Sequence, residues 1–183
     1  ITPSWERYCQ ASPQRCWFDR GGRSDRNGYL GPGGDAQRAH NDRLQWLFSA
    51  LDVITPSIYL GIQSNTTSLN ATAYVQSTVE EAIRLAKTAG EQTLVMPCAW
   101  HHYDDYWRIP SPTPRDLLTA ADLAIELNVP LTAGADGILI WGAVNGPASS
   151  PQSAEALQKY AAGTLASVTN NICHDGTFEC AAT

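Results

Sequence analysis

Apolar side chains recur at intervals of three and four residues in four stretches of the chain, the spacing that gives a helix one apolar face. The second of these stretches is followed directly by Gly90, a residue type that commonly ends helices. Thr113 stands before the third stretch as a candidate helix cap, and Ser150 followed by Pro151 opens the fourth. Four helices are therefore predicted, over residues 41–51, 72–89, 114–127 and 151–170.

Short runs rich in apolar residues lie outside these helices and predict strands. They cover residues 53–60, 93–100 and 138–141, and a weaker run covers residues 5–8. Strands that alternate with helices along a chain lie parallel to one another and are buried on both faces. Pro56 lies inside one of the runs and implies a bulge or an irregular pairing there. The order of elements predicts an α/β fold.

Four strand–helix units amount to half of a (β/α) barrel, so we expect half of a TIM-like barrel with parallel strands. A flavodoxin-like open sheet is the main alternative architecture. That fold would need a Gly-rich phosphate turn after the first strand, and this sequence has none there. We treat residues 1–183 as one region, with a long aperiodic loop at residues 10–40 and a disulfide-prone tail at residues 173–183.

The composition is that of an ordinary folded domain. Of the 183 residues, 43% are hydrophobic and 16% are charged, which is enough to fill a core. The net charge of −6 argues against non-specific binding of nucleic acid, which needs a basic surface. No apolar run approaches the roughly 20 residues that cross a bilayer. The chain begins at Ile1 and shows no signal-peptide pattern, so we expect a processed or trimmed product.

The cysteines fit local disulfides better than a metal site. Cys9 and Cys16 lie close together in loop-like sequence, as do Cys173 and Cys180, and each pair suits a disulfide. No two cysteines have the Cys-x-x-Cys spacing of structural zinc sites. Cys98 lies inside an apolar run, so we predict a buried thiol there and not a reactive one.

Two glycosylation sequons begin at Asn65 and Asn70, in a polar stretch before a predicted helix. Glycans at these positions and disulfides elsewhere belong to proteins that pass through an oxidising compartment. We therefore expect a secreted protein, extracellular or luminal.

Aromatic and acidic side chains gather where the predicted strands end. In a parallel barrel these ends converge on one mouth, where active sites lie. Tyr and Trp offer flat apolar faces to sugar rings, and aspartates accept hydrogen bonds from sugar hydroxyl groups. We therefore predict a sugar-binding site at the mouth and interpret Trp17 and Trp46 as core residues. The residues at the predicted strand ends are Tyr8, Tyr59, the run from Trp100 to Asp105 and the run from Trp141 to Asn145.

Other kinds of site fit the spacing less well. The pair His101-His102 beside Asp104-Asp105 suggests metal ligation, but neighbours on an extended chain point to opposite faces. The same divergence argues against Asp104 and Asp105 as the two carboxylates of a glycosidase. No Ser-His-Asp arrangement and no Gly-x-Ser-x-Gly elbow occurs in the sequence. We predict neither a metal nor a cofactor.

Five motifs, in order along the chain, carry a likeness to a known family. They are NDRLQWLFSALDVITPSIYL at residues 41–60, VEEAIRLAK at 79–87, HYDD at 102–105, AGADGILIWGA at 133–143 and ALQKYAAGTLASVTNNIC at 156–173. Together they resemble animal hyaluronidases, glycoside hydrolase family 56, including the family's Pro-Ser-Ile-Tyr strand, Tyr-Asp loop and Trp-Gly strand. The likeness covers nearly the whole chain but only the carboxyl-terminal half of the family's domain.

The resemblance implies a distorted (β/α) barrel that cleaves β-linked N-acetylhexosaminides in glycosaminoglycans with retention of configuration. In that mechanism the acetamido oxygen of the substrate is the nucleophile, and a glutamate in an Asp-x-Glu motif is the general acid. By resemblance, Tyr59 would be the catalytic residue that holds the acetamido group. Tyr8, Asp104 and Trp141 would shape the same subsite, and Tyr103 of the Tyr-Asp loop would be a further substrate contact.

The chain also departs from the family's pattern. Asp-x-Glu occurs nowhere in it, and the cysteine that opens the family's last helix is absent from the run SSPQSAEA. We therefore expect the amino-terminal half of the same precursor, or another chain, to complete the barrel and supply the acid. The alternatives are a lectin-like or structural protein that keeps the aromatic mouth without the acid, and an open α/β module with no role in sugar binding.

Overall fold

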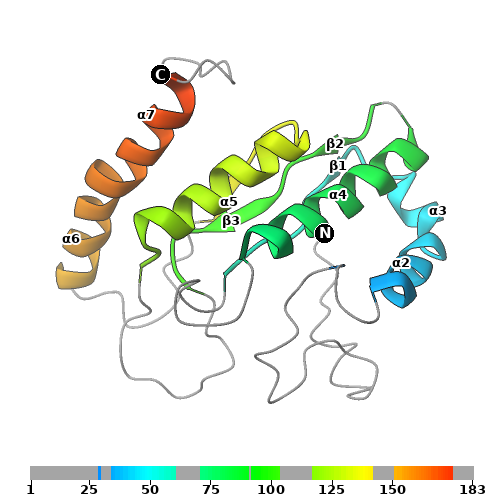
Figure 1. Cartoon of the computed structure of the whole chain (residues 1–183), viewed down its shortest axis with the longest axis horizontal. Helices are drawn as coiled ribbons and strands as arrows, with labels where there is room; N and C mark the ends of the chain where they lie inside the picture. Colours follow the sequence, from blue (N-terminus) through cyan, green and yellow to red (C-terminus); the bar gives the residue numbers. More distant parts are fainter. Residues whose placement is uncertain are drawn as a thin grey trace.

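The computed structural model describes residues 29, 34–60, 71–90, 92–103, 117–141 and 151–174. Helices and short strands alternate in this part of the chain, as predicted (Figure 1). The strands are β1 (Val53–Ile54), β2 (Leu94–Val95), β3 (Cys98–Trp100) and β4 (Leu139–Trp141). The helices are α2 (Gly34–Asp42), α3 (Gln45–Phe48), α4 (Ala71–Ala89), α5 (Ala120–Ala133), α6 (Pro151–Tyr160), the π-helical segment η4 (Ala161–Leu165) and α7 (Ala166–His174).

The strands form three adjacent parallel rows, here called tracks: β1, the segment from β2 to β3, and β4. β1 pairs with β2, and β3 pairs with β4, both in parallel orientation. A parallel bridge between Ser57 and Cys98 extends the first pairing as far as β3. The segment from β2 to β3 therefore runs between the other two tracks, and the predicted parallel arrangement is confirmed.

The strands are shorter than the apolar runs predicted. Residues 53–60 and 93–100 give ladders of two residues in β1 and β2 and of three residues in β3. Pro56 and Pro97 lie between the paired stretches, and proline has no N–H group to donate to a ladder. Pairing resumes at Ser57, so the irregularity predicted at Pro56 is confirmed.

Helices α4 and α5 lie side by side over the strands, with α2 and α3 beyond α4 (Figure 1). The continuous rod of α6, η4 and α7 packs against α5 from the other direction. The main apolar core gathers strand-end, α4 and α5 side chains, among them Ile58, Leu60, Val75, Val79, Leu123 and Leu127. A smaller core joins Ile54 and Val95 to Ala82, Leu85 and Ala86 of α4.

The amino-terminal helices differ from the prediction. Residues 34–40 were expected in the long loop but belong to α2, and the single helix expected over residues 41–51 is divided between α2 and α3. Trp46, interpreted as a core residue, is 70% exposed. Its neighbour Phe48 packs against the smaller core instead. Two residues turn a helix by about 200°, so Trp46 and Phe48 point in nearly opposite directions.

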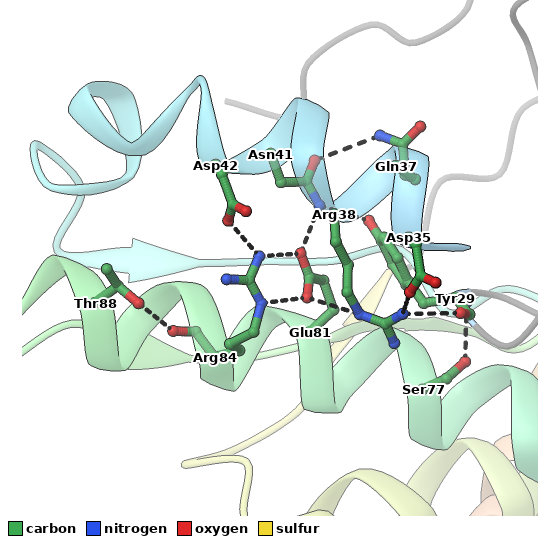
Figure 2. Close-up of polar contacts among 10 residues, drawn as sticks. All are labelled: Tyr29, Asp35, Gln37, Arg38, Asn41, Asp42, Ser77, Glu81, Arg84 and Thr88. Carbon is green, nitrogen blue, oxygen red and sulfur yellow. Dashed lines mark hydrogen bonds and ion pairs between the residues drawn. The ribbon is translucent and has the colours of Figure 1, made fainter. Parts of the chain in front are cut away.

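Polar contacts hold α2 against α4 (Figure 2). The sequence of α2 therefore needs no apolar side chains at helical spacing, and for this reason the helix was not predicted. The carboxylate of Glu81, 3% exposed, accepts hydrogen bonds from Asn41 Nδ2 at 2.8 Å and from Arg84 Nε at 2.7 Å. Arg38 Nε lies 3.6 Å from the same carboxylate, and Arg84 also bonds Asp42 at 2.7 Å. The hydrogen bond with Glu81 raises the pKa of the Arg84 guanidinium further above its ordinary value. Two guanidinium groups and an amide thus compensate the buried charge.

Helix α5 starts later than predicted. It begins at Ala120, and its N-cap is Thr119, not Thr113. The Thr119 hydroxyl accepts a hydrogen bond from the Asp122 N–H at 3.2 Å and donates one to the Asp122 carboxylate at 3.1 Å. The Thr119 hydroxyl thus satisfies one of the N–H groups that the first turn of the helix leaves without an intrahelical partner.

Helix α5 also continues beyond residue 127, where the prediction ended it. The helix passes through Pro130 and ends at Gly134, whose φ of +99° is left-handed. The N–H groups of Gly134 and Ala135 bond the carbonyl oxygens of Leu131 and Pro130 at 3.0 Å each. These bonds close the carboxyl end of the helix as in other glycine-capped helices.

The last helical stretch runs through α6, η4 and α7 without a break, and Pro151 is its first residue, as predicted. It extends to His174, past the predicted end at residue 170. None of the helices described is long and apolar enough to cross a membrane.

Candidate functional site

Two of the predicted site aromatics meet at the ends of neighbouring strands. Tyr59 follows the Ser57 bridge, and Trp100 is the last residue of β3. Their ring centroids are 5.6 Å apart with an interplanar angle of 55°. Tyr59 is half-buried, while Trp100 is 6% exposed. The parallel tracks therefore bring together two side chains that are far apart in the sequence.

Trp141 lies at the next position along this edge. It is the last residue of β4 and its backbone is in register with Trp100. The structure describes its backbone but not its side chain. The strand ends that carry Tyr59, Trp100 and Trp141 are thus neighbours on one edge of the sheet, as predicted.

Several predicted residues fall outside the described part of the chain. Tyr8, Asp104, the sequon residues Asn65 and Asn70, and the cysteines Cys9, Cys16 and Cys180 belong to this group, and Cys173 is described by its backbone alone. Their roles in substrate binding, glycosylation and disulfide bonding stay predictions.

Tyr103 has an internal partner beneath the strand ends. The side chain is 5% exposed, and its hydroxyl donates a short hydrogen bond to the Asp122 carboxylate. The same hydroxyl accepts a hydrogen bond from the Thr119 N–H at 3.2 Å. Burial, and next the bond with Asp122, raise the pKa of Tyr103 above its ordinary value, so the phenol is neutral at physiological pH. Its part in substrate binding stays a prediction.

A second carboxylate of α5 reaches the strand ends directly. Glu126 is fully buried, at 0% exposure. One of its oxygens accepts the Leu60 N–H and the other accepts the Trp100 N–H, each at 2.9 Å. Glu126 therefore joins the backbone beside Tyr59 to the backbone of Trp100.

Sequence reasoning missed Asp122 and Glu126. The signal available was their position on α5, because side chains four residues apart lie on one helix face. They share that face with the core residues Leu123 and Leu127, which are separated by the same interval. Acidic residues next to an apolar stripe are usually solvated, so their burial becomes evident only in the fold.

The histidine pair differs from the expectation. The rings of His101 and His102 do not diverge: their centroids are 4.2 Å apart. Both residues lie just past β3, where His102 forms an antiparallel bridge with Leu117, so the alternation of an extended strand no longer applies. Within the described ranges, no group of three His, Cys, Asp or Glu side chains is placed to hold a metal ion.

Cys98 is a free cysteine that is partly, not fully, buried. Burial raises the pKa of its thiol above the ordinary value. The group is therefore protonated at physiological pH, the weakly nucleophilic form.

The comparisons with known proteins now decide the family. The family model described as hyaluronidase, glycoside hydrolase family 56, matches residues 14–183. This chain belongs to the hyaluronidase family. The inactive hyaluronidase B of Vespula vulgaris is 35% identical over 123 residues, which are 67% of this chain and 33% of that protein. The hyaluronidase of Apis mellifera is 38% identical over 104 residues, which are 56% of this chain and 25% of that protein.

Solved hyaluronidase structures share the fold. The crystal structure of bee venom hyaluronidase matches with a TM-score of 0.63 and 28% identity, over 77% of this chain and 41% of that one. Its complex with a hyaluronic acid tetramer matches with a TM-score of 0.61 and 29% identity, over 73% and 39% of the two chains. The chain thus spans between 25% and 41% of the length of these hyaluronidases.

Proposed function

We propose that this chain carries the substrate-positioning part of a hyaluronidase-type glycoside hydrolase that acts on β-linked N-acetylhexosaminides of a glycosaminoglycan. The observation that carries the proposal is the contact of Tyr59 with Trp100 at the carboxyl ends of neighbouring parallel strands. Trp141 lies next to them on the same edge. In barrel enzymes this edge carries the reacting groups.

The proposed chemistry divides the work between two pieces of polypeptide. Tyr59 would bond the acetamido group, orienting its oxygen for attack on the anomeric carbon, while the aromatic faces pack on the sugar ring. The attack cleaves the glycosidic bond only if an acid protonates the departing oxygen. These 183 residues contain no Asp-x-Glu, so the acid would come from an amino-terminal segment of the same precursor or from another chain.

Exposed apolar residues in the strands support a complementary piece of polypeptide. Leu94, Leu139 and Ile140 are 43%, 42% and 44% exposed, although strand residues in an α/β fold are normally buried on both faces. We propose that the amino-terminal half of the barrel covers them and that these residues form the carboxyl-terminal half. Secretion, with disulfides and with glycans at Asn65 and Asn70, belongs to the same proposal.

Tyr59→Phe in the full-length gene product tests the catalytic role. We expect kcat on hyaluronan to fall by about 100-fold, because the hydroxyl that orients the acetamido group is lost. Affinity for a hyaluronan tetramer should change by less than about threefold, because the ring face stays. Tyr29→Phe makes the same chemical change in the polar cluster of α2 and α4, where the Tyr29 hydroxyl accepts a hydrogen bond from Asn41 Nδ2 at 3.2 Å, and should leave both quantities unchanged (Figure 2).

A non-catalytic carbohydrate-binding protein is the second candidate. One observation favours it, because a relative 35% identical to this chain is named an inactive hyaluronidase. In that case the full-length protein binds the tetramer without turning it over, and Tyr59→Phe lowers affinity alone. Equal losses of affinity and turnover would also contradict the catalytic role.

A further inference from the structure

The parallel ladder between the first two tracks stops just before the candidate site. At its last bridge the Cys98 N–H donates to the Pro56 oxygen at 2.8 Å, and the Ile58 N–H donates to the Cys98 oxygen at 3.1 Å. The next donors along a continued parallel ladder would be the N–H groups of Trp100 and Leu60. Both instead donate to the two oxygens of Glu126.

The carboxylate of Glu126 thus occupies the place of the next ladder bonds. A backbone carbonyl would hold the strands at the usual separation of about 4.8 Å, whereas an inserted carboxylate lets the two chains separate and still satisfies both amides. A carboxylate suits this position because it has two acceptor oxygens and no donor. Its complete burial requires such partners, because an unpaired buried charge is strongly unfavourable.

We propose that Glu126 is a positioning residue of the sugar site: it sets the separation of the two strand ends and thereby the placement of Tyr59 against Trp100. Leu60 follows Tyr59 directly, and Trp100 carries the second ring itself, so both bonds act at the backbone of the pair. The inference rests on the proposed function for its effect on sugars, but the spacing itself is a property of the fold.

Glu126→Gln is the decisive variant, because it keeps the size of the side chain. An amide has one acceptor oxygen and one NH2 donor, so one of the two backbone N–H groups would face a donor. Glu126→Asp keeps both acceptor oxygens on a shorter side chain. It should therefore retain more activity than Glu126→Gln.

Glu81→Gln is the matched control. Glu81 is equally a buried glutamate of a helix, but it lies in the polar cluster between α2 and α4 and bonds side chains only in the contacts of Figure 2. We therefore expect this variant to be less stable than wild type but to keep the placement of Tyr59 against Trp100.

The experiment measures hydrogen exchange at the Leu60 and Trp100 amides, thermal stability, and kcat and KM on hyaluronan, all in the full-length protein. For Glu126→Gln we expect at least about tenfold faster exchange at one or both amides and a fall in kcat of about ten- to 100-fold. For Glu81→Gln we expect no change at these amides and kcat within about twofold of wild type, whatever the loss in stability.

Several results would overturn the inference. They are unchanged exchange at both amides in Glu126→Gln, a fall in kcat equal to that of Glu81→Gln at equal stability, and an activity of Glu126→Asp no higher than that of Glu126→Gln. If wild type binds the tetramer without cleaving it, affinity replaces kcat as the readout, and the same comparison decides. If wild type does neither, the proposed function fails, and amide exchange alone still decides whether Glu126 sets the spacing.

Discussion

Tyr103 and Tyr160 are both buried, yet their hydroxyl groups are in different surroundings. The Tyr103 hydroxyl bonds Asp122 and Thr119. The Tyr160 hydroxyl is buried and has no hydrogen-bond partner within the described ranges. The two side chains are 5% and 8% exposed, so burial itself is nearly equal. The pair therefore separates the effect of a buried hydrogen bond from the effect of a buried ring.

Tyr103→Phe should lower the free energy of unfolding by about 1–3 kcal/mol, because it removes a donor from the buried Asp122 carboxylate. Tyr160→Phe removes a buried hydroxyl that bonds no described residue and should not lower this free energy, because no hydrogen bond within the described ranges is lost. Urea unfolding of the two variants beside wild type gives both numbers. Equal losses in the two variants would show that the Asp122 bond contributes nothing of its own.

Tyr160 also gives a pH dependence with a defined sign. Burial first, and then the charge of Glu126, raise its pKa from the ordinary 10.0 to about 12. Between these values the unfolded chain has released the proton that the folded chain still holds, so stability is complete below pH 10 and falls as pH rises toward 12. Urea midpoints measured from pH 8 to 11.5 should fall less steeply in Tyr160→Phe than in wild type. Parallel curves would contradict the raised pKa.

At the residue scale, the sequence predicted those site residues whose place depends on the order of the strands alone. Tyr59 and Trp100 were predicted together because strand ends in parallel order meet at one edge, and this follows from the apolar runs alone. The role of Glu126 could not be predicted, because it depends on where the ladder of backbone hydrogen bonds stops. That point is set by residues of three different elements. Trp46 was assigned to the core on its residue type, whereas its direction depended on the phase of a four-residue helix.

Helix ends are the element-scale feature that sequence predicted least well. Thr113 and Thr119 both stand before helix-forming sequence, and each has an aspartate three positions later, so the local sequence does not separate the two candidate caps. The helix predicted over residues 114–127 ended too early, because α5 passes through Pro130 and reaches the glycine cap at Gly134, one turn beyond that proline. In α2 the contacts that stabilise the helix are polar and come from α4, so the local sequence held no apolar signal. The existence and order of the longer helices were predicted, because each has a clear apolar face.

Replacing two glycines by alanine should change the stability of the protein in opposite directions. Gly134→Ala should destabilise the protein by about 1–2 kcal/mol, because an alanine in the left-handed region is strained. The nearest atom to the added carbon is Ile83 Cδ1 at 3.8 Å, an ordinary contact, so packing adds no penalty. Gly163→Ala lies in helical backbone with nothing within 4 Å of the added carbon and should stabilise by about 0.5–1 kcal/mol. Thermal unfolding of both variants checks the opposite signs, and a shift in the same direction would contradict the assigned conformations.

At the scale of the whole molecule, some strand side chains are fully buried while others are exposed to solvent. Helices α4 and α5 bury one set of side chains completely, as at Ile58 and Leu60. In β4, however, the consecutive residues Leu139 and Ile140 are 42% and 44% exposed. Neighbours along a strand face opposite sides, so both faces of β4 are incompletely covered by the described residues. The sequence predicted parallel strands with half the number of units in a closed barrel, and this exposure is consistent with that count.

The double variant Leu139→Lys/Ile140→Lys tests whether another segment of polypeptide covers β4. If the amino-terminal half of the barrel packs there, two buried lysines would oppose its docking, because a buried charge without a partner is strongly unfavourable. We expect residues 1–183 produced alone to associate with a separately produced amino-terminal half, and the double variant to weaken that association by at least about 100-fold. Trp46→Lys is the control, since this exposed aromatic lies on α3, away from β4, and should leave the association unchanged. Analytical ultracentrifugation measures both affinities. A stable 19.8 kDa monomer that binds neither the amino-terminal half nor a dye for exposed apolar surface would contradict the two-piece barrel, because the apolar side chains of β4 would then need no cover.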